Sequence, residues 1–211
     1  NLEAVLGEIV EAAIAIAAAD FGNIQILDPA TGDLRIVAQR GLPAWWIDYW
    51  DRAGQGLGSC HAAWARGERI LVEDVERSPI FAGTPALAIQ LRAGIRAIQS
   101  TPLVSRSGTP LGMFSTHYKT PRRMDERALR LLDLLARQAA DIVERAQSEE
   151  ALRASEERLK LAYQVAHIGA FEWDVQTGVN TWTPRLERMY GLAPGGFGGT
   201  QPAWEQLLHP D

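Results

Sequence analysis

Few side chains in this sequence have the chemistry of a catalytic or metal site. The only cysteine, Cys60, is followed by His61, and the other histidines stand at positions 117, 167 and 209. A lone thiol could sense oxidants, and the imidazole of His61 or His117 could ligate haem. A zinc ion needs three or four ligands, and these histidines do not have the spacing of a ligand set. The default role of an unpaired cysteine is that of a small buried apolar side chain.

Tryptophans near Cys60 and small polar residues on later segments suggest a binding pocket instead. Trp45, Trp46, Trp50 and Trp64 surround the cysteine in sequence, and aromatic walls suit small ligands, although aromatic core packing needs none. Met113, Ser115 and His117 alternate along one segment, as residues on one face of a strand do. We expect a pocket between a sheet and the segment 50–64. Its candidate ligand-binding residues are Trp50, Cys60, Trp64, Ser100, Ser115 and His117.

No set of residues suggests catalysis. The glycine-rich run at 195–199 lacks the Lys and Ser/Thr that follow in a phosphate-binding loop. Cys60 has no evident base partner. We therefore expect no catalytic residue, no metal site and no enzymatic activity within this chain.

Composition narrows the class of partner. The net charge of -5 disfavours nucleic acid, because binding phosphates requires clustered Lys and Arg. No apolar run reaches the 18 or more residues of a membrane helix, so we expect no membrane contact in this chain. A single cysteine is compatible with a cytoplasmic location. The sequence begins at Asn1 and stops at Asp211 in mid-pattern, so we expect it to be part of a longer protein.

Periodicity predicts an α+β fold for the first part of the chain. Apolar spacing and turn residues predict three helices and five strands around a loop at 41–58. The two hairpins turn at 28–32 and 105–108, so we expect an antiparallel sheet with flanking helices. The helices are expected at 2–19, 60–66 and 86–93, with a Ser59 cap, and the strands at 23–27, 34–38, 69–74, 95–104 and 111–118.

A helix of about forty residues is predicted from Met124. Leu132, Leu135, Ala139, Ile142, Ala146 and Glu149 repeat at three- and four-residue spacing, the pattern of a coiled coil. Around Glu149 the spacing becomes three and three, a stammer that would locally overwind a supercoil. We expect a parallel homodimer formed by the first helix and this long helix. In a monomer these coiled-coil positions would be largely exposed to solvent. The alternative is a helix that packs only on its own domain.

Residues 1–148 resemble a GAF domain of bacterial sensor proteins. The resemblance lies in the order of five pieces: Gly22-Asn-Ile-Gln-Ile-Leu-Asp-Pro-Ala-Thr-Gly, Gly56-Leu-Gly-Ser-Cys, Arg69-Ile-Leu-Val-Glu-Asp-Val, Ile98-Gln-Ser-Thr-Pro-Leu-Val and Gly112-Met-Phe-Ser-Thr-His. In phytochrome-like members a Cys-His pair attaches a bilin, but that cysteine lies later, just before the equivalent of 91–99, where this chain has none. The Asn-Lys-x-Asp motif of cyclic-nucleotide binders is also missing. Methionine-sulfoxide reductases on this fold use several cysteines, and this chain has one.

Residues 167–211 resemble the N-terminal half of a PAS domain. Gly169-Ala-Phe-Glu-Trp-Asp, Thr177-Gly178, Trp182-Thr183 and His209-Pro-Asp211 carry the likeness. The resemblance implies a sensor region at 1–123, a signalling helix at 124–166 and a PAS-like part at 167–211. It implies a regulatory module that binds an unknown small ligand or a partner and signals to a downstream kinase or cyclase. The output implied first is a histidine kinase of a two-component phosphorelay. The alternatives are a cyclic-dinucleotide cyclase and a ligand-free dimerisation scaffold. The sequence leaves the cofactor unknown.

Overall fold

The protein is described by a computed structural model that covers residues 1–53, 58–165 and 168–208. Two compact units divide it, Asn1–Ser148 and Glu149–Asp211, and each is described by itself. Within the described ranges, no helix has the length and apolarity needed to cross a bilayer.

The first unit is built on one five-stranded sheet, and every strand pairing in it is antiparallel. The spatial order of the strands is β2-β1-β5-β4-β3. This confirms the predicted α+β fold with an antiparallel sheet and flanking helices. The strands are β1 (Phe21–Leu27), β2 (Leu34–Arg40), β3 (Ile70–Val72), β4 (Ala97–Val104) and β5 (Pro110–Tyr118). The helices are α1 (Leu2–Ala17), α2 (Ala44–Ala53), α3 (Gly58–Arg66), the short 3-10 helix η1 (Val75–Arg77), α4 (Pro85–Arg92) and α5 (Glu126–Val165).

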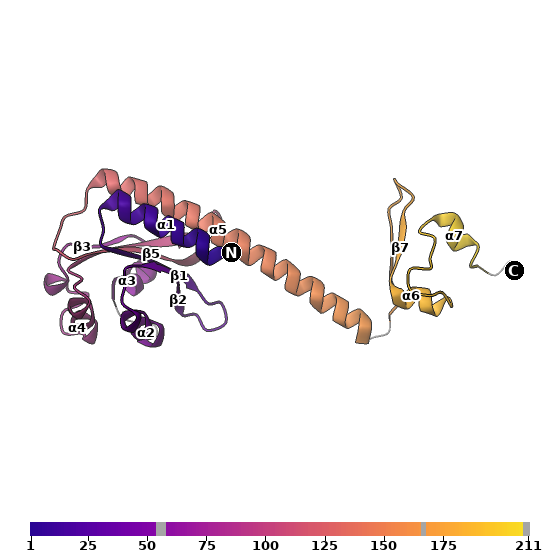
Figure 1. Ribbon diagram of the computed structural model, residues 1–211, viewed down its shortest axis with the longest axis horizontal. Helices are drawn as coiled ribbons and strands as arrows, with labels where there is room; N and C mark the ends of the chain where they lie inside the picture. The colour runs from indigo at the N-terminus through magenta and orange to yellow at the C-terminus, as the bar shows by residue number, and fades with distance from the viewer. Residues whose placement is uncertain (54–57, 166–167, 209–211) are drawn as a thin grey trace. The chain divides into compact units, whose positions relative to one another are not determined.

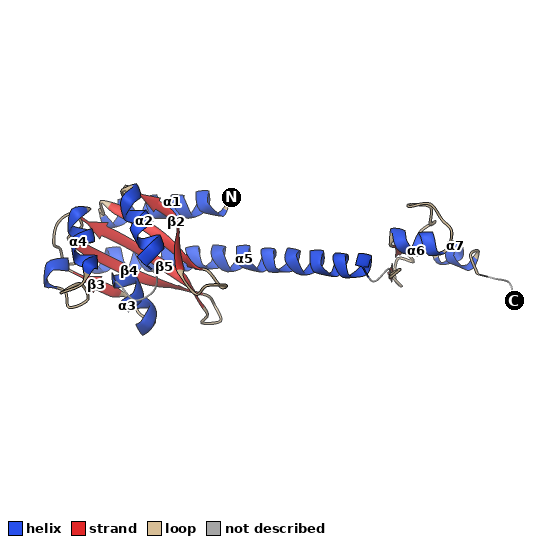
Figure 2. Cartoon of the chain, turned by 90° about the horizontal axis from the view of Figure 1, so that it is seen from below, coloured by secondary structure: helices blue, strands red, loops and turns tan. Residues whose placement is uncertain are grey.

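Helices cover both faces of this sheet. Helices α1 and α5 lie on one face, and α2, α3 and α4 lie on the other (Figures 1 and 2). Each face has its own apolar core. Ile24 and Phe114 belong to the core under α1 and α5, whereas Ile98 and Met113 belong to the core under the shorter helices. Side chains alternate between the faces along each strand, so neighbouring residues of β4 and β5 contribute to different cores.

Helix α1 presents two apolar stripes. Leu6, Val10 and Ala13 are fully buried against the sheet, whereas Val5 and Ile16 are exposed. The helix is capped by Ala18, which takes a left-handed conformation with φ 46, close to the end at residue 19 that the sequence predicted. Gly22 lies in β1, where α1 packs closely on the strand. A Cβ at this position would approach Val10 Cγ1 to 3.0 Å, which favours glycine.

The predicted loop at 41–58 is wrong, because α2 forms within it. Its aromatic residues Trp46 and Trp50 are one turn apart, and the amide of Trp46 donates to the carbonyl of Pro43 at the helix start. Glycines on both sides of this segment obscured the helical pattern. The predicted Ser59 cap is also wrong, since α3 begins at Gly58 and the Ser59 hydroxyl accepts a hydrogen bond from Ser100.

Helix α5 begins at Glu126 and runs for 40 residues. The expectation that a monomer exposes the predicted coiled-coil positions is wrong for Leu132 and Ala139, which are buried against the domain's own sheet. Leu131 and Leu134, which the prediction did not include, are exposed instead. The helix thus packs one stripe inward and keeps a second apolar stripe outside.

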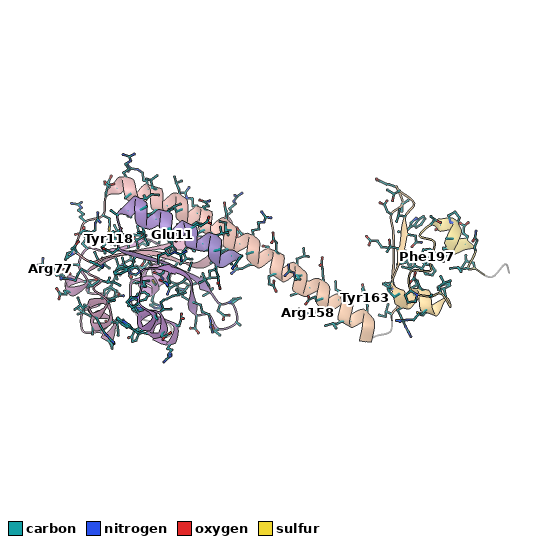
Figure 3. All side chains as sticks on the ribbon, viewed as in Figure 1. Glu11, Arg77, Tyr118, Arg158, Tyr163 and Phe197 are labelled. Carbon is teal, nitrogen blue, oxygen red and sulfur yellow. The ribbon has the colours of Figure 1, made fainter. Side chains whose placement is uncertain are left out.

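The second unit has a two-stranded sheet and short helices. Trp182 stacks on Phe197 with ring centroids 3.9 Å apart, and Phe197 is labelled in Figure 3. The buried carboxylate of Glu187 accepts hydrogen bonds from the amides of Gly195 and Phe197, so it holds the glycine-rich segment 195–199 in place. The elements are β6 (Phe171–Trp173), β7 (Asn180–Trp182), α6 (Pro184–Met189) and α7 (Gln201–Glu205).

Candidate functional site

A cavity of about 60 Å³ lies on the face of the sheet that α2, α3 and α4 cover. Gln25 and His117 contribute from β1 and β5, which are adjacent strands. Trp46 and Trp50 come from α2, and Cys60 comes from α3. The site is therefore assembled from segments far apart in sequence.

Aromatic rings form one wall of the cavity. The rings of Trp46 and Trp50 lie 5.7 Å apart at an interplanar angle of 58°, and Trp46 meets the His117 ring edge-on at 5.4 Å. The Trp46 indole donates its N–H to Gln90 Oε1 at 3.2 Å, so α2 is tied to α4. Because this N–H is used, Trp46 offers a ligand only its ring.

His117 is a buried, neutral imidazole. It is 2% exposed, and its Nε2 lies 2.8 Å from Asn23 Oδ1 on the neighbouring strand. With that oxygen as acceptor, Nε2 carries the proton and Nδ1 keeps a lone pair. Burial lowers the pKa of His117 to about 3, because a charged ring would lose its hydration there. The side chain thus presents an uncharged acceptor to the cavity.

A cluster of hydroxyl and thiol groups lies beside the cavity. Ser100 Oγ is 2.9 Å from Ser115 Oγ and donates to Ser59 Oγ at 3.0 Å. The Cys60 thiol lies 3.4 Å from Ser115 Oγ. Burial raises the pKa of the Cys60 thiol, which disfavours the reactive thiolate. This environment suits a packed, neutral thiol and gives no support to oxidant sensing.

Several buried polar atoms at the site have no partner. Among the described residues, no group hydrogen-bonds to Gln25 Oε1, Trp50 Nε1 or His117 Nδ1. All three residues line the cavity, whereas Asn23 Nδ2, also unpartnered, lies behind His117. Leaving such atoms unpaired costs about 1–3 kcal/mol each. Three residues that line one small cavity therefore hold two acceptors and one donor whose hydrogen-bonding capacity no described group uses.

The six predicted site residues lie close together. Trp50, Cys60, Trp64 and His117 line the cavity, and Ser100 and Ser115 lie next to it through their hydrogen bonds to the Cys60 thiol. Of the four tryptophans named from the sequence, Trp45 lies elsewhere, under the Arg92 guanidinium.

Sequence reasoning missed Gln25 and Gln90. The alternation of Asn23 and Gln25 with two isoleucines in β1 was a signal for Gln25, since it places both amides on one face. No sequence signal identified Gln90, because α4 has a weak pattern and only the fold brings it to Trp46.

No metal site accompanies the cavity. Over the described ranges, no three His, Cys, Asp or Glu residues are close enough to hold an ion. His167 and His209 lie outside those ranges, as do Gly56 and Leu57 of the second sequence piece.

A set of contacts connects the sheet to α5. The Arg69 guanidinium donates from Nε to Thr101 Oγ1 at 3.0 Å and from Nη2 to the carbonyl of Leu129 at 3.3 Å. It also forms an ion pair with Asp133 of α5. Thr101 and Ser100 are adjacent in β4, with Thr101 on the α5 side and Ser100 on the cavity side. The Arg69 contacts therefore join β4 to α5.

The second unit has an aromatic cavity of its own, of about 360 Å³. Trp173, Trp182 and Trp204 line it, together with Asn180, whose buried Oδ1 has no partner among the described residues. Phe171 and Trp173 remain 65% and 45% exposed at this surface.

Comparison with known proteins gives a family and a set of folds. Residues 1–144 match the family model of the GAF domain. A domain assigned to a two-component sensor histidine kinase protein of Sinorhizobium meliloti 1021 is 27% identical, with a TM-score of 0.60, and the match covers 72% of this chain and 97% of that one. No curated protein matches the sequence.

Two further structures share the fold. The GAF domain of a phosphoenolpyruvate-protein phosphotransferase from Coxiella burnetii is 21% identical, with a TM-score of 0.60 and coverage of 72% of this chain and 87% of that one. The blue-light absorbing form of the PixJ GAF domain from Thermosynechococcus elongatus is 19% identical, with a TM-score of 0.53 and coverage of 74% and 93%. At these identities the likeness extends to the fold alone.

Proposed function

The chain belongs to the GAF domain family of sensory and regulatory modules, and we propose that its cavity binds a small molecule whose presence is relayed through α5 to an output domain. The observation that carries this proposal is the convergence of unpartnered atoms from Gln25, Trp50 and His117 on one cavity. A purely structural interior would pair or replace such groups, because each costs stability. A ligand with complementary groups would recover that cost on binding.

The relay is proposed to pass through β4 and β5. Ser100, Ser115 and His117 are on the cavity side of these strands, and their sequence neighbours Thr101 and Thr116 are on the α5 side. The Arg69 contacts to Thr101 and Asp133 join the strand to the helix. A two-state change at the cavity would shift α5, which is the element that leads out of the first unit.

We place the chain in the input region of a sensor histidine kinase located in the cytoplasm. The 27% identity to the Sinorhizobium meliloti domain, across nearly all of that domain, supports this parent. The second unit would then be the first part of a PAS domain, and its exposed Phe171 and Trp173 would be covered by the remainder of that domain. A cyclic-dinucleotide cyclase is the other candidate output, and phosphohistidine formation by the full-length protein with ATP separates the two.

Ligand binding is tested by mass spectrometry of small molecules released when the purified chain is denatured. Protein from its native host should release one compound that the Gln25→Leu variant does not retain. Gln147→Leu, an exposed glutamine of α5 outside the cavity, is the matched control and should retain it. Adding the compound should slow amide hydrogen exchange in residues 126–148. The absence of any released compound, together with unchanged exchange on adding host metabolite extract, would contradict the proposal.

We also propose a parallel homodimer through the outer surfaces of α1 and α5. Val5, Ile16, Leu131 and Leu134 are between 37% and 59% exposed on these two helices, and further along α5 Leu152 and Leu159 are more than half exposed. Burying one such side chain fully is worth about 1.5–3 kcal/mol. Tyr163 and Arg158 also project from this part of the helix (Figure 3). The stammer around Glu149 remains the proposed point at which two helix packings could exchange.

Sedimentation velocity tests the dimer. Leu134→Glu should raise the dimer dissociation constant at least tenfold, because it places two charges in an apolar contact. Ala88→Glu, which introduces the same charge at an exposed residue of α4 on the opposite face of the sheet, should leave the constant unchanged. A wild-type chain that remains monomeric at high micromolar concentration would refute the dimer and leave the ligand proposal intact.

A further inference from the structure

The unpartnered atoms at the cavity define a hydrogen-bonding pattern. Gln25 Oε1 and His117 Nδ1 are acceptors, and Trp50 Nε1–H is a donor. Gln25 and His117 are 6% and 2% exposed, so neither can exchange freely with bulk water. A complementary ligand carries two donors and one acceptor.

The charge around the cavity excludes an anion. None of the lining residues that the structure describes is lysine or arginine. The carboxylates among them, Asp33 and Asp51, belong to the end of the β1–β2 hairpin and to α2, and Asp51 is exposed. His117 is neutral because burial lowers its pKa to about 3. The three groups with unpartnered atoms are therefore all uncharged, and a buried anion would have no paired countercharge in the cavity.

Size and shape restrict the ligand further. A cavity of about 60 Å³ holds roughly four to six waters, which corresponds to a molecule of few non-hydrogen atoms. The Trp46 ring has its N–H occupied by Gln90, so it presents only its apolar surface. A flat molecule can lie against this ring while its edge reaches the polar atoms.

We propose that the cavity recognises a small, flat, uncharged ligand of the cyclic urea or cyclic amide class, in which N–H donors flank a carbonyl acceptor. Its N–H groups donate to Gln25 Oε1 and His117 Nδ1, and its carbonyl accepts from Trp50 Nε1–H. This inference rests on the proposed ligand-binding function of the same cavity and adds the chemistry of the ligand.

Three five-membered carbonyl rings of equal size test the donor pattern. 2-Imidazolidinone has two N–H groups, 2-pyrrolidinone has one and cyclopentanone has none. Each is titrated into the ¹⁵N-labelled chain, and the indole N–H resonance of Trp50, assigned with the Trp50→Phe variant, reports binding. Affinity should fall about five- to tenfold with each N–H removed, because each loss leaves one acceptor unpaired again. Equal affinity of the three rings would overturn the donor pattern.

Charged probes and variants test the remaining parts of the proposal. Pyrrolidinium and pyrrole-2-carboxylate should bind at least tenfold more weakly than 2-imidazolidinone, and a charged probe that binds more tightly would overturn the neutral class. Gln25→Leu should weaken 2-imidazolidinone at least tenfold, and Gln147→Leu should not. Trp50→Phe, which keeps an aromatic ring and removes the donor, should also weaken binding, with the backbone amide resonances of β1 and β5 as the readout. This variant keeps the proposal testable should Gln25→Leu fail to fold.

Failure of this inference is distinguishable from failure of the proposed function. If no probe binds while a co-purified compound is released from wild type and not from Gln25→Leu, the ligand class is wrong and the sensing function stands. If no probe binds and no compound co-purifies, both fall.

Discussion

Both faces of the sheet contain buried polar groups, but the two faces differ in how completely those groups are hydrogen-bonded. On the face under α1 and α5, Thr116 Oγ1 donates to Gln99 Oε1, Gln99 Nε2 donates to Thr101 Oγ1, and Thr101 also accepts from Arg69. None of these side chains has an unpartnered buried atom among the described residues. On the cavity face, Gln25, Trp50 and His117 each have one.

This difference separates a structural face of the sheet from the face on which we propose that a ligand binds. A closed hydrogen-bond network fixes one packing of the strands and helices, which suits a structural face. Buried donors and acceptors that lack a partner lower stability, so proteins retain them where another molecule forms hydrogen bonds with them. Strand β5 contributes to both faces, with Thr116 on one and His117 on the other, so along this strand the two faces are separated only by the alternation of side chains.

The largest expected effect lies in the structural face. Leu132→Ala removes a side chain that is 1% exposed under α5 and should lower the free energy of unfolding by about 2–5 kcal/mol. Leu134→Ala, two residues away and 59% exposed, should change it by less than about 0.5 kcal/mol. Urea denaturation at a concentration where both variants are in the same oligomeric state measures the pair. Equal losses would mean that α5 does not pack on the sheet as described.

A matched glutamine pair tests the comparison itself. Gln99→Leu removes the hydrogen bonds of Gln99 to the Thr101 and Thr116 hydroxyls and should cost about 1–3 kcal/mol of unfolding free energy. Gln25→Leu removes an atom that is already unpaired, so the ligand-free chain should change by less than about 0.5 kcal/mol or become more stable. Chemical denaturation after exhaustive dialysis measures both. A larger loss for Gln25→Leu than for Gln99→Leu would break the distinction between the two faces.

A smaller effect is expected from pH. The pKa of His117 falls from 6.5 to about 3 on folding, so between these values the unfolded chain binds more protons than the folded one. The His117 contribution to stability is therefore full above pH 6.5 and declines as the pH falls toward 3, by at most about 1.4 kcal/mol per pH unit. His117→Gln should show a shallower decline in urea titrations between pH 6.5 and 4.5. Identical slopes would place His117 in contact with water.

The sequence predicted much of the fold because it contains the periods of strands and helices. All five strands of the first unit, both hairpins and the long helix were expected at nearly their observed positions. The α2 helix was missed because Trp46 and Trp50 lie among residues with weak helical preference, and because tertiary contacts of Trp46 with Gln90 and His117 stabilise the helix. The outward stripes of α1 and α5 were misassigned because both helices are apolar on more than one side.

The site was predictable in part. His117 and Ser115 were identified from the alternation of residues along a single strand, which can be seen in the sequence. The hydrogen-bond partners of these side chains cannot be seen there. Thr116 and Gln99 differ from Gln25 and His117 only in which neighbours the fold brings to them. Which polar groups remain open is therefore knowable only from the three-dimensional arrangement.

Long-range ¹H–¹⁵N correlation spectra of the His117 ring test the central claim most directly, since they report the protonation of Nδ1 and Nε2 separately. In the free chain we expect a neutral ring that is protonated at Nε2 between pH 5 and 8, with an Nδ1 resonance typical of a free lone pair. This resonance should move upfield when 2-imidazolidinone donates a hydrogen bond to Nδ1. A protonated Nδ1 in the free chain, or an Nδ1 resonance that stays fixed while the ligand binds, would contradict the claim that this face of the sheet holds its hydrogen bonds open for a ligand.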